Sequence, residues 1–448
     1  VFGDWSSDVC SSDLLDLEPA LNWSNADQTR KVLVAAALLA ELISMLSALT
    51  VIILAGTQVG LKRVVLDVRR LRLFVACALI ILAALVVVQR VNTPVIFENP
   101  ALEAGIRQAL DRPQGSIYQR QLLALVELDL SGLQITSLDG IEKLANLVSL
   151  DLRDNQIRDI SALSHLKKLE SLDLRDNRLI DISPLSGLSR LEYVNIYGNS
   201  AIRSISPLAS LTNLKKLVMA GVPVGGEEDL LAGLTNLEYL NLRNCGVTTT
   251  DFLSALSKLT YLNLHSNPDI RSIHALAGLR NLETLILAHI PLQDQSEYIA
   301  DLNKLVHLNL RNTGISDISF LSGLPRLQYL NLHSNSHIGS IAPLASLTGL
   351  KHLILQDVPV NGQIDALAAL TKLQTLNLRH SGITSIAFLS DLFTRGALQD
   401  DPKRDESAAL DIRDNPISAA EGDAFASIRP FWRARSEEHT SELQSPNT

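Results

Sequence analysis

Tyrosine, arginine and histidine side chains recur at regular intervals through the middle of the chain, and all three types can recognise a ligand. Arginine and tyrosine are enriched among the residues that contribute most to binding at protein interfaces. We therefore predict a binding surface for another protein, with a surface glycan as the alternative ligand; the competing interpretation is that these residues were only copied with a duplicated segment. The candidate contacts are Tyr193, Tyr197, Tyr239, Arg243, Tyr261, His265, Arg311, Tyr329, His333 and Arg379.

Metal binding and catalysis are two further chemistries that the histidines raise. His265 and His333 occupy equivalent positions three predicted strands apart, and His307 and His352 two strands apart, which corresponds to about 14 and 10 Å. Those separations are too long for two ligands of one ion. The sequence also contains no HExxH pair, CxxC pair, GxSxG turn or phosphate-binding glycine-rich loop. We expect no metal, no cofactor and no enzymatic activity in the visible chain.

A repeat of 22 or 23 residues must position these side chains. The hexapeptide LNLHSN occurs at residues 262–267 and again at 330–335, and a block of three repeats recurs every 68 residues. Thirteen turns of this period predict a solenoid in which each turn adds a short strand and buries its leucines against its neighbours. The repeats start at Leu125, Leu147, Leu169, Leu191, Leu214, Leu237, Leu259, Leu282, Leu305, Leu327, Leu350, Leu373 and, in degenerate form, Ser407.

The repeated LxxLxL pattern over residues 125–418 resembles the leucine-rich repeat family. Residues 97–147, FENPALEAGIRQALDRPQGSIYQRQLLALVELDLSGLQITSLDGIEKLANL, look like the cap and first repeats of its bacterial, internalin-like members. The resemblance implies an α/β fold, a leucine-rich repeat solenoid with a curved parallel sheet, and a role in protein recognition or adhesion.

A short helix is predicted before the first repeat. Asn99 can cap its amino end, Pro100 suits the first helical position, and Leu102, Ile106 and Leu110 form one apolar stripe that can cover the first repeat. At the other end, residues 410–417 (LDIRDNPI) close the array. The polar insertion before them, residues 394–407, is predicted to be an exposed loop.

The ninth position of most repeats holds a small polar residue that can satisfy turn backbone groups. We predict a structural asparagine ladder there, with Cys245, Thr313 and Ser381 as smaller substitutes. In the third member of each block this position is apolar and precedes a proline, as in Val222, so that turn must be built differently. The ladder asparagines are Asn155, Asn177, Asn199, Asn267, Asn335 and Asn415.

The third, fifth and seventh positions are predicted to face the concave surface, because side chains alternate along a strand. In the first repeats each arginine lies two residues from an aspartate, as in DLRDN at 151–155, and such a surface neutralises itself. From Leu191 to Arg379 the fifth position lacks carboxylates, and tyrosines stand nearby. Val218, Ile286 and Ile354 interrupt the fifth position every third repeat, about 14 Å apart.

Two apolar segments, residues 32–55 and 73–90, are long enough to be predicted as transmembrane helices. The basic residues 56–72 between them favour a cytoplasmic loop, which would place the repeats outside the cytoplasm. Glu41 within the first segment is expected to be neutral or paired. A stripe of small residues that includes Ala36 and Ala40 would permit helix pairing or self-association.

Both ends of the chain, residues 1–14 and 435–448, resemble a sequencing-library adapter translated on opposite strands, so we expect them to be artefacts and the chain to be a fragment. They contribute −5 to the formal net charge of −9, so no strongly basic character remains to indicate nucleic-acid binding. Cys77 and Cys245, the two cysteines left, form no disulfide framework. Residues 15–31, 91–124 and 419–434 are predicted as an amino-terminal tail, a linker with the helical cap, and a carboxyl-terminal segment.

Two other functions fit the same sequence. The repeats would be a targeting module if a catalytic domain lies beyond the visible chain. They would be a cytoplasmic scaffold or regulator if the membrane topology is reversed.

Overall fold

The computed structural model describes residues 75–83, 93–293, 295–360, 362–398 and 409–417. The first predicted transmembrane segment, the basic loop and the adapter-like ends lie outside these residues. Of the second segment, 75–83 are described; they are helical, with largely exposed apolar side chains such as Leu79 and Ile80. Within the described residues, no helix combines the length and the hydropathy needed to cross a membrane.

The chain divides into two compact units, residues 1–96 with 116–122, and residues 97–115 with 123–448. In the first unit, β1 (Pro94–Val95) pairs antiparallel with β2 (Ile117–Tyr118). The short helix α4 (Gln119–Leu122) follows β2 directly, and the side chain of Gln121 accepts a hydrogen bond from the backbone N–H of Tyr118.

The second unit begins with helix α3 (Pro100–Ala109). As predicted, the Asn99 side chain caps it by accepting hydrogen bonds from two backbone N–H groups, and a proline occupies its first turn. Leu102 and Ile106 are fully buried. A Cβ added to Gly105 would clash with Leu130, so the glycine permits close packing of α3 on the first repeat.

Thirteen short strands form one parallel sheet in which sequence order equals spatial order, which confirms the predicted solenoid. Each strand pairs in register with the next, so equivalent repeat positions stand side by side, as Tyr239 stands beside Tyr261. The strands are β3 (Glu127–Asp129), β4 (Ser149–Asp151), β5 (Ser171–Asp173), β6 (Tyr193–Asn195), β7 (Lys216–Val218), β8 (Tyr239–Asn241), β9 (Tyr261–Asn263), β10 (Thr284–Ile286), β11 (His307–Asn309), β12 (Tyr329–Asn331), β13 (His352–Ile354), β14 (Thr375–Asn377) and β15 (Ala409–Asp411).

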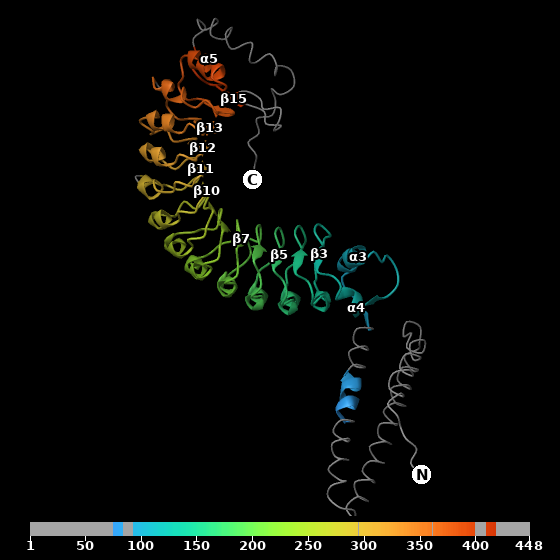
Figure 1. The fold of residues 1–448 in the computed structure, drawn as a ribbon. Helices are drawn as coiled ribbons and strands as arrows, with labels where there is room; N and C mark the ends of the chain where they lie inside the picture. Colours follow the sequence, from blue (N-terminus) through green and yellow to red (C-terminus); the bar gives the residue numbers. More distant parts are fainter. Residues whose placement is uncertain (1–74, 84–92, 294, 361, 399–408, 418–448) are drawn as a thin grey trace, which may run out of the picture. The chain divides into compact units, whose positions relative to one another are not determined.

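Short 3-10 helices return the chain from each of the strands β3–β13 to the next repeat. Figure 1 shows the strands on the inner side of the curve of this unit and the 3-10 helices on its outer side. The helices are η1 (Ile141–Lys143), η2 (Ser161–His165), η3 (Ser183–Gly187), η4 (Ser206–Ser210), η5 (Glu228–Gly233), η6 (Asp251–Ala255), η7 (His274–Gly278), η8 (Ser296–Tyr298), η9 (Ser319–Gly323), η10 (Ala342–Ser346) and η11 (Ile364–Leu367).

Each ninth-position asparagine lies inside the turn that follows the strand of its own repeat. Asn267 is fully buried; its Nδ2 donates to the carbonyl oxygens of Leu242 and Leu264 (2.9 and 2.7 Å), and its Oδ1 accepts from the backbone N–H of Cys245 and Val247 (3.1 and 3.0 Å). Asn155, Asn177, Asn199, Asn335 and Asn415 make corresponding bonds. Each amide thus links two consecutive repeats.

The third repeat of each block uses a different side chain for the same purpose. Glu227, Gln295 and Gln363 occupy its fourteenth position, and each carboxylate or amide oxygen accepts the backbone N–H of Ile205, Ile273 or Ile341 in the preceding repeat. This brace ties a repeat without the asparagine to the preceding repeat, and it does so at the start of the 3-10 helix and not in the turn.

The eighth position has a positive φ in every repeat of the array. Asp154, Asn244, Ser266, His289 and His380 have φ values of 58°, 52°, 59°, 61° and 52°. Glycine adopts this conformation freely, and aspartate, asparagine and histidine adopt it more often than other residues, whereas serine does so less readily. The sharp turn after the strand is therefore a property of the repeat and not of one residue type.

The carboxyl-terminal insertion is only partly the exposed loop that the sequence predicts. Helix α5 (Ala387–Thr394) reaches its first residue, and Ala397 and Leu398 within it are buried. Residues 399–408 lie outside the described part of the chain.

Candidate functional site

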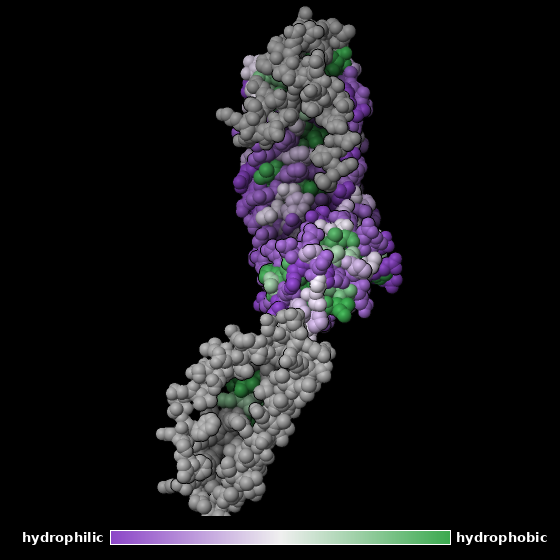
Figure 2. Space-filling model, turned by 90° about the vertical axis from the view of Figure 1, so that its right-hand side faces the viewer, coloured by the Kyte–Doolittle hydropathy of each residue, from purple (hydrophilic) through white to green (hydrophobic). Residues whose placement is uncertain are grey.

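The strand face of the solenoid presents three columns of side chains at the third, fifth and seventh repeat positions. Third- and fifth-position residues are mostly half-buried, while the leucine between them is buried. Figure 2 shows that the described part of this side of the array is mainly hydrophilic, with hydrophobic residues in scattered groups. A ligand on this face would therefore meet individual polar and aromatic side chains and not a broad apolar surface.

Aromatic rings in the third column stack along the sheet. Tyr239 and Tyr261 lie parallel, with ring centroids 3.9 Å apart. The ammonium group of Lys216 lies between two rings, 5.2 Å from the Tyr193 centroid and 4.7 Å from that of Tyr239. Such contacts favour a cation through the ring quadrupole. Burial and nearby Asp173 raise the pKa of Tyr193 to about 12, so its hydroxyl stays protonated.

A second stack begins two strands later. The rings of His307 and Tyr329 are parallel at 3.9 Å, and His352 follows at 6.1 Å with a tilt of 43°. Burial, with a contribution from His352, lowers the pKa of His307 to about 4. His307 is thus a neutral aromatic ring at physiological pH.

The seventh column places two arginines near these stacks. Among the ion pairs of the described residues, none includes Arg243, Arg311 or Lys216. The fifth-position neighbours Asn241 and Asn309 are neutral, and each accepts the backbone N–H of its arginine. Burial, together with Arg243, lowers the pKa of nearby His265 to about 4.

These residues form what we call the central patch. It extends over β6–β12 and combines stacked rings with cations that have no carboxylate partner in the described structure. The central patch consists of Tyr193, Lys216, Tyr239, Arg243, Tyr261, His307, Arg311 and Tyr329.

Other predicted contacts already have partners or stand apart. The Nε2 of His333 lies 3.0 Å from Asp357, and Arg379 Nε donates to Asp414 at 2.6 Å. Both carboxylates occupy the eighth position, which the sequence reasoning on the fifth position did not consider. Tyr197 is 43% exposed at the amino-terminal edge of the central patch.

Lys216 and His307 are the central-patch residues that the predicted contacts did not include. The sequence reasoning considered His307 only as a metal ligand. The prediction selected tyrosine, arginine and histidine by type, and Lys216 is the third-position residue between Tyr193 and Tyr239. Aligning the whole third column would have found it, because consecutive third positions pair directly across parallel strands.

The concave surface over β3–β5 differs from the central patch. Arg153 pairs with Asp151 at 3.3 Å, and Arg175 lies 3.9 Å from Asp154. These pairs agree with the self-neutralising surface that the DLRDN pattern indicates.

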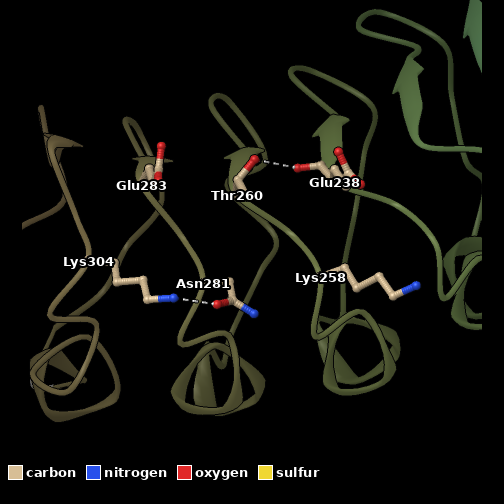
Figure 3. Close-up of a pocket in the computed structure, with 6 residues that line it drawn as sticks. All are labelled: Glu238, Lys258, Thr260, Asn281, Glu283 and Lys304. Atoms are coloured by element: carbon tan, nitrogen blue, oxygen red, sulfur yellow. Dashed lines mark hydrogen bonds between the residues drawn. The ribbon is translucent and has the colours of Figure 1, made fainter.

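A polar hollow of about 290 Å³ lies outside the concave columns, on the flank where each repeat enters its strand. In Figure 3, Lys304 reaches Asn281 across one repeat, with Nζ to Oδ1 at 2.8 Å, and Thr260 donates to the Glu238 carbonyl oxygen at 3.0 Å. Lys304 and Asn281 are the one pair of lining side chains with a hydrogen bond between them in the described structure. Among the described residues, no group of three or more histidine, cysteine or acidic side chains is placed to hold a metal ion.

Comparison with known proteins gives a consistent result. The sequence of residues 116–342 matches the protein family described as leucine-rich repeat region. The structure is similar to that of an internalin from Listeria monocytogenes, with 29% identity and a TM-score of 0.64 over 73% of this chain and 93% of that one. A leucine-rich repeat protein from Leptospira interrogans is similar in fold, with 21% identity and a TM-score of 0.55 over 69% of this chain and 89% of that one. No curated protein sequence matches the chain.

Proposed function

Because the chain belongs to the leucine-rich repeat family, we propose that it is a recognition or adhesion module that binds another protein through its concave face. The observation that carries the proposal is the central patch, where Lys216, Arg243 and Arg311 form no ion pair within the described structure. The arginines at the seventh position over β4 and β5, Arg153 and Arg175, do form ion pairs. The proposed role is binding and not catalysis.

The charges of the central patch favour an acidic partner. A carboxylate brought to Arg243 or Arg311 would form a charge-assisted hydrogen bond without displacing an existing ion pair. The neighbouring rings supply rigid apolar area, which loses little conformational freedom on binding. Electrostatic complementarity of this kind gives specificity and faster association.

Selection from a random peptide library displayed on phage would test this surface even though the natural partner is not identified. We expect clones selected on the full chain to be acidic and to lose binding when Tyr239, Arg243, Tyr261 and Arg311 are all changed to alanine. The matched control carries Arg153→Ala and Arg175→Ala and should retain binding. Equal binding to the fourfold variant, with unchanged circular dichroism, would refute the assignment of this face.

A glycan is the second ligand class, since tyrosine rings can also stack on sugars. Screening the full chain on an array of acidic glycans separates the two classes. A glycan that binds the full chain but not the fourfold variant would replace the protein partner in this proposal.

The cellular placement that we propose rests on the sequence pattern of residues 32–55 and 73–90. The module would be anchored in a membrane by these segments, possess an outward-facing array, and associate further through the small-residue stripe. Asn213→Cys, at the exposed flank of the array, would provide a test on intact cells. Labelling by an impermeant thiol reagent supports the outward placement, whereas labelling only after lysis would support the cytoplasmic scaffold. Whether the array targets a further domain can be tested by sequencing the gene beyond both ends of this chain.

A further inference from the structure

From β6 to β13 the third column of the concave face consists of long side chains except at one strand, β10, where it holds Thr284. Thr284 pairs with Tyr261 on one side and with His307 on the other. Tyr261 stacks on Tyr239 and His307 stacks on Tyr329, each in the direction away from β10. The free faces of Tyr261 and His307 therefore look toward each other across the short side chain of Thr284.

The three blocks of the array show what this position normally holds. Lys216, Thr284 and His352 are equivalent residues, 68 positions apart. In the first block the Lys216 ammonium fills the space between Tyr193 and Tyr239, and in the third block the His352 ring lies beside Tyr329. The second block alone leaves the corresponding space without a long side chain.

The space over Thr284 has the dimensions of one planar group. Tyr261 and His307 are two strands apart, which places their rings about 10 Å from each other. A ring between two others at van der Waals contact needs about 7–8 Å. Thr284 and Ile286, both on β10, form the floor of this space. Ala288, two residues further along the chain, is fully buried. The rings of His265 and His289 meet edge to face, with centroids 5.1 Å apart.

We infer that this space is a slot that takes one aromatic side chain from an acidic segment of a partner protein. The inference rests on the proposed function and names the contact that would give it specificity. The floor offers the hydroxyl of Thr284 and the apolar Ile286, so a planar apolar ring fits it better than a sugar with many hydroxyl groups. The positive charges of Lys216, Arg243 and Arg311 oppose a cation and attract carboxylates beside the ring.

Calorimetric titration of the full chain with three peptides tests the slot: Ac-EEWEE-NH2, Ac-EEAEE-NH2 and Ac-EEKEE-NH2. We expect the tryptophan peptide to bind at least tenfold more tightly than the other two. Thr284→Tyr, which continues the ring stack, should remove this preference, and Thr284→Ser, which leaves the slot open, should keep it. Ser149→Tyr adds a ring at the same repeat position on β4 and should have no effect.

The outcomes separate the slot from the proposed function. Equal binding of the three peptides, lost with Arg243→Ala and Arg311→Ala, would overturn the slot but retain the concave face as the binding surface. Tighter binding of the lysine peptide would assign the slot to a cation and overturn the aromatic occupant. Absence of peptide binding together with binding of 3′-sialyllactose would overturn it in favour of a glycan, and no binding of any probe at millimolar concentration would count against both proposals.

Discussion

The concave surface over β3–β5 and that over β7–β11 share one backbone but use their charges differently. Over β3–β5, Arg153 and Arg175 contact carboxylates of their own or a neighbouring repeat. Over β7–β11, Arg243 and Arg311 lie beside neutral asparagines and have no ion pair within the described structure. The scaffold is held together by residues inside the turns, so the surface of each strand can change without changing the fold.

The largest expected effect is on stability, and it should be the same in both regions. Changing Asn155 or Asn267 to alanine leaves several buried backbone groups without a partner, which should lower the free energy of unfolding by about 3 kcal/mol. Urea unfolding followed by circular dichroism measures this. A cost below about 1 kcal/mol at either site would show that the two regions do not share a scaffold.

The second prediction gives the central region the charge pattern of the first strands. Asn241→Asp with Asn309→Asp should place a carboxylate beside Arg243 and Arg311, as Asp151 lies beside Arg153. The fold should tolerate this, because Asp151 and Asn241 accept the same backbone hydrogen bond. Binding of an acidic peptide selected on the full chain should weaken about tenfold, or about 1.4 kcal/mol. Unchanged affinity, measured by calorimetry, would mean that charge does not distinguish the regions.

The third prediction concerns pH, since histidines occur in the concave columns of the later strands and not in those of β3–β5. Burial holds the pKa of His265 and of His307 at about 4, below the value of about 6.5 in an unfolded chain. The unfolded chain therefore binds protons first as the pH falls, and stability should decrease between pH 6.5 and 4. We expect about 1 kcal/mol for each histidine after solvent screening. His265→Gln with His307→Gln should flatten the unfolding profile over this range, and a profile identical to that of the unmodified chain would contradict the assignment.

The smallest effect is expected where ion pairs lie on the surface. Arg153→Ala removes a half-exposed pair with Asp151, so the free energy of unfolding should change by less than about 0.5 kcal/mol and peptide binding should be unaffected. Chemical unfolding and calorimetry on this variant supply the reference for the other three. A loss of binding here would extend the site to β4.

The repeat period made the solenoid and its strand positions predictable from sequence, and the capping residue Asn99 with the apolar stripe after it made the helical cap predictable. Repetition places Leu240 and Leu262 in the core whatever the detailed geometry. The brace from Glu227, Gln295 and Gln363 was not predictable, because it joins side chains to backbone groups 22 residues away. Nor was the pairing of Arg379 with Asp414 predictable, because these residues are 35 positions apart across the long last repeat. Contacts between columns depend on side-chain conformation, which periodicity does not determine.

The brace also affects how the length of the protein can change. Gln295 and Gln363 make the same bond at the end of two successive blocks, so each block ends in an interchangeable junction. A recombination event that inserted one more block would extend the array by three strands, about 14 Å, and would create only junctions of a kind already present. Natural variation in this gene could therefore change the length of the array by whole blocks of three repeats, while the strands within each block keep the same neighbours.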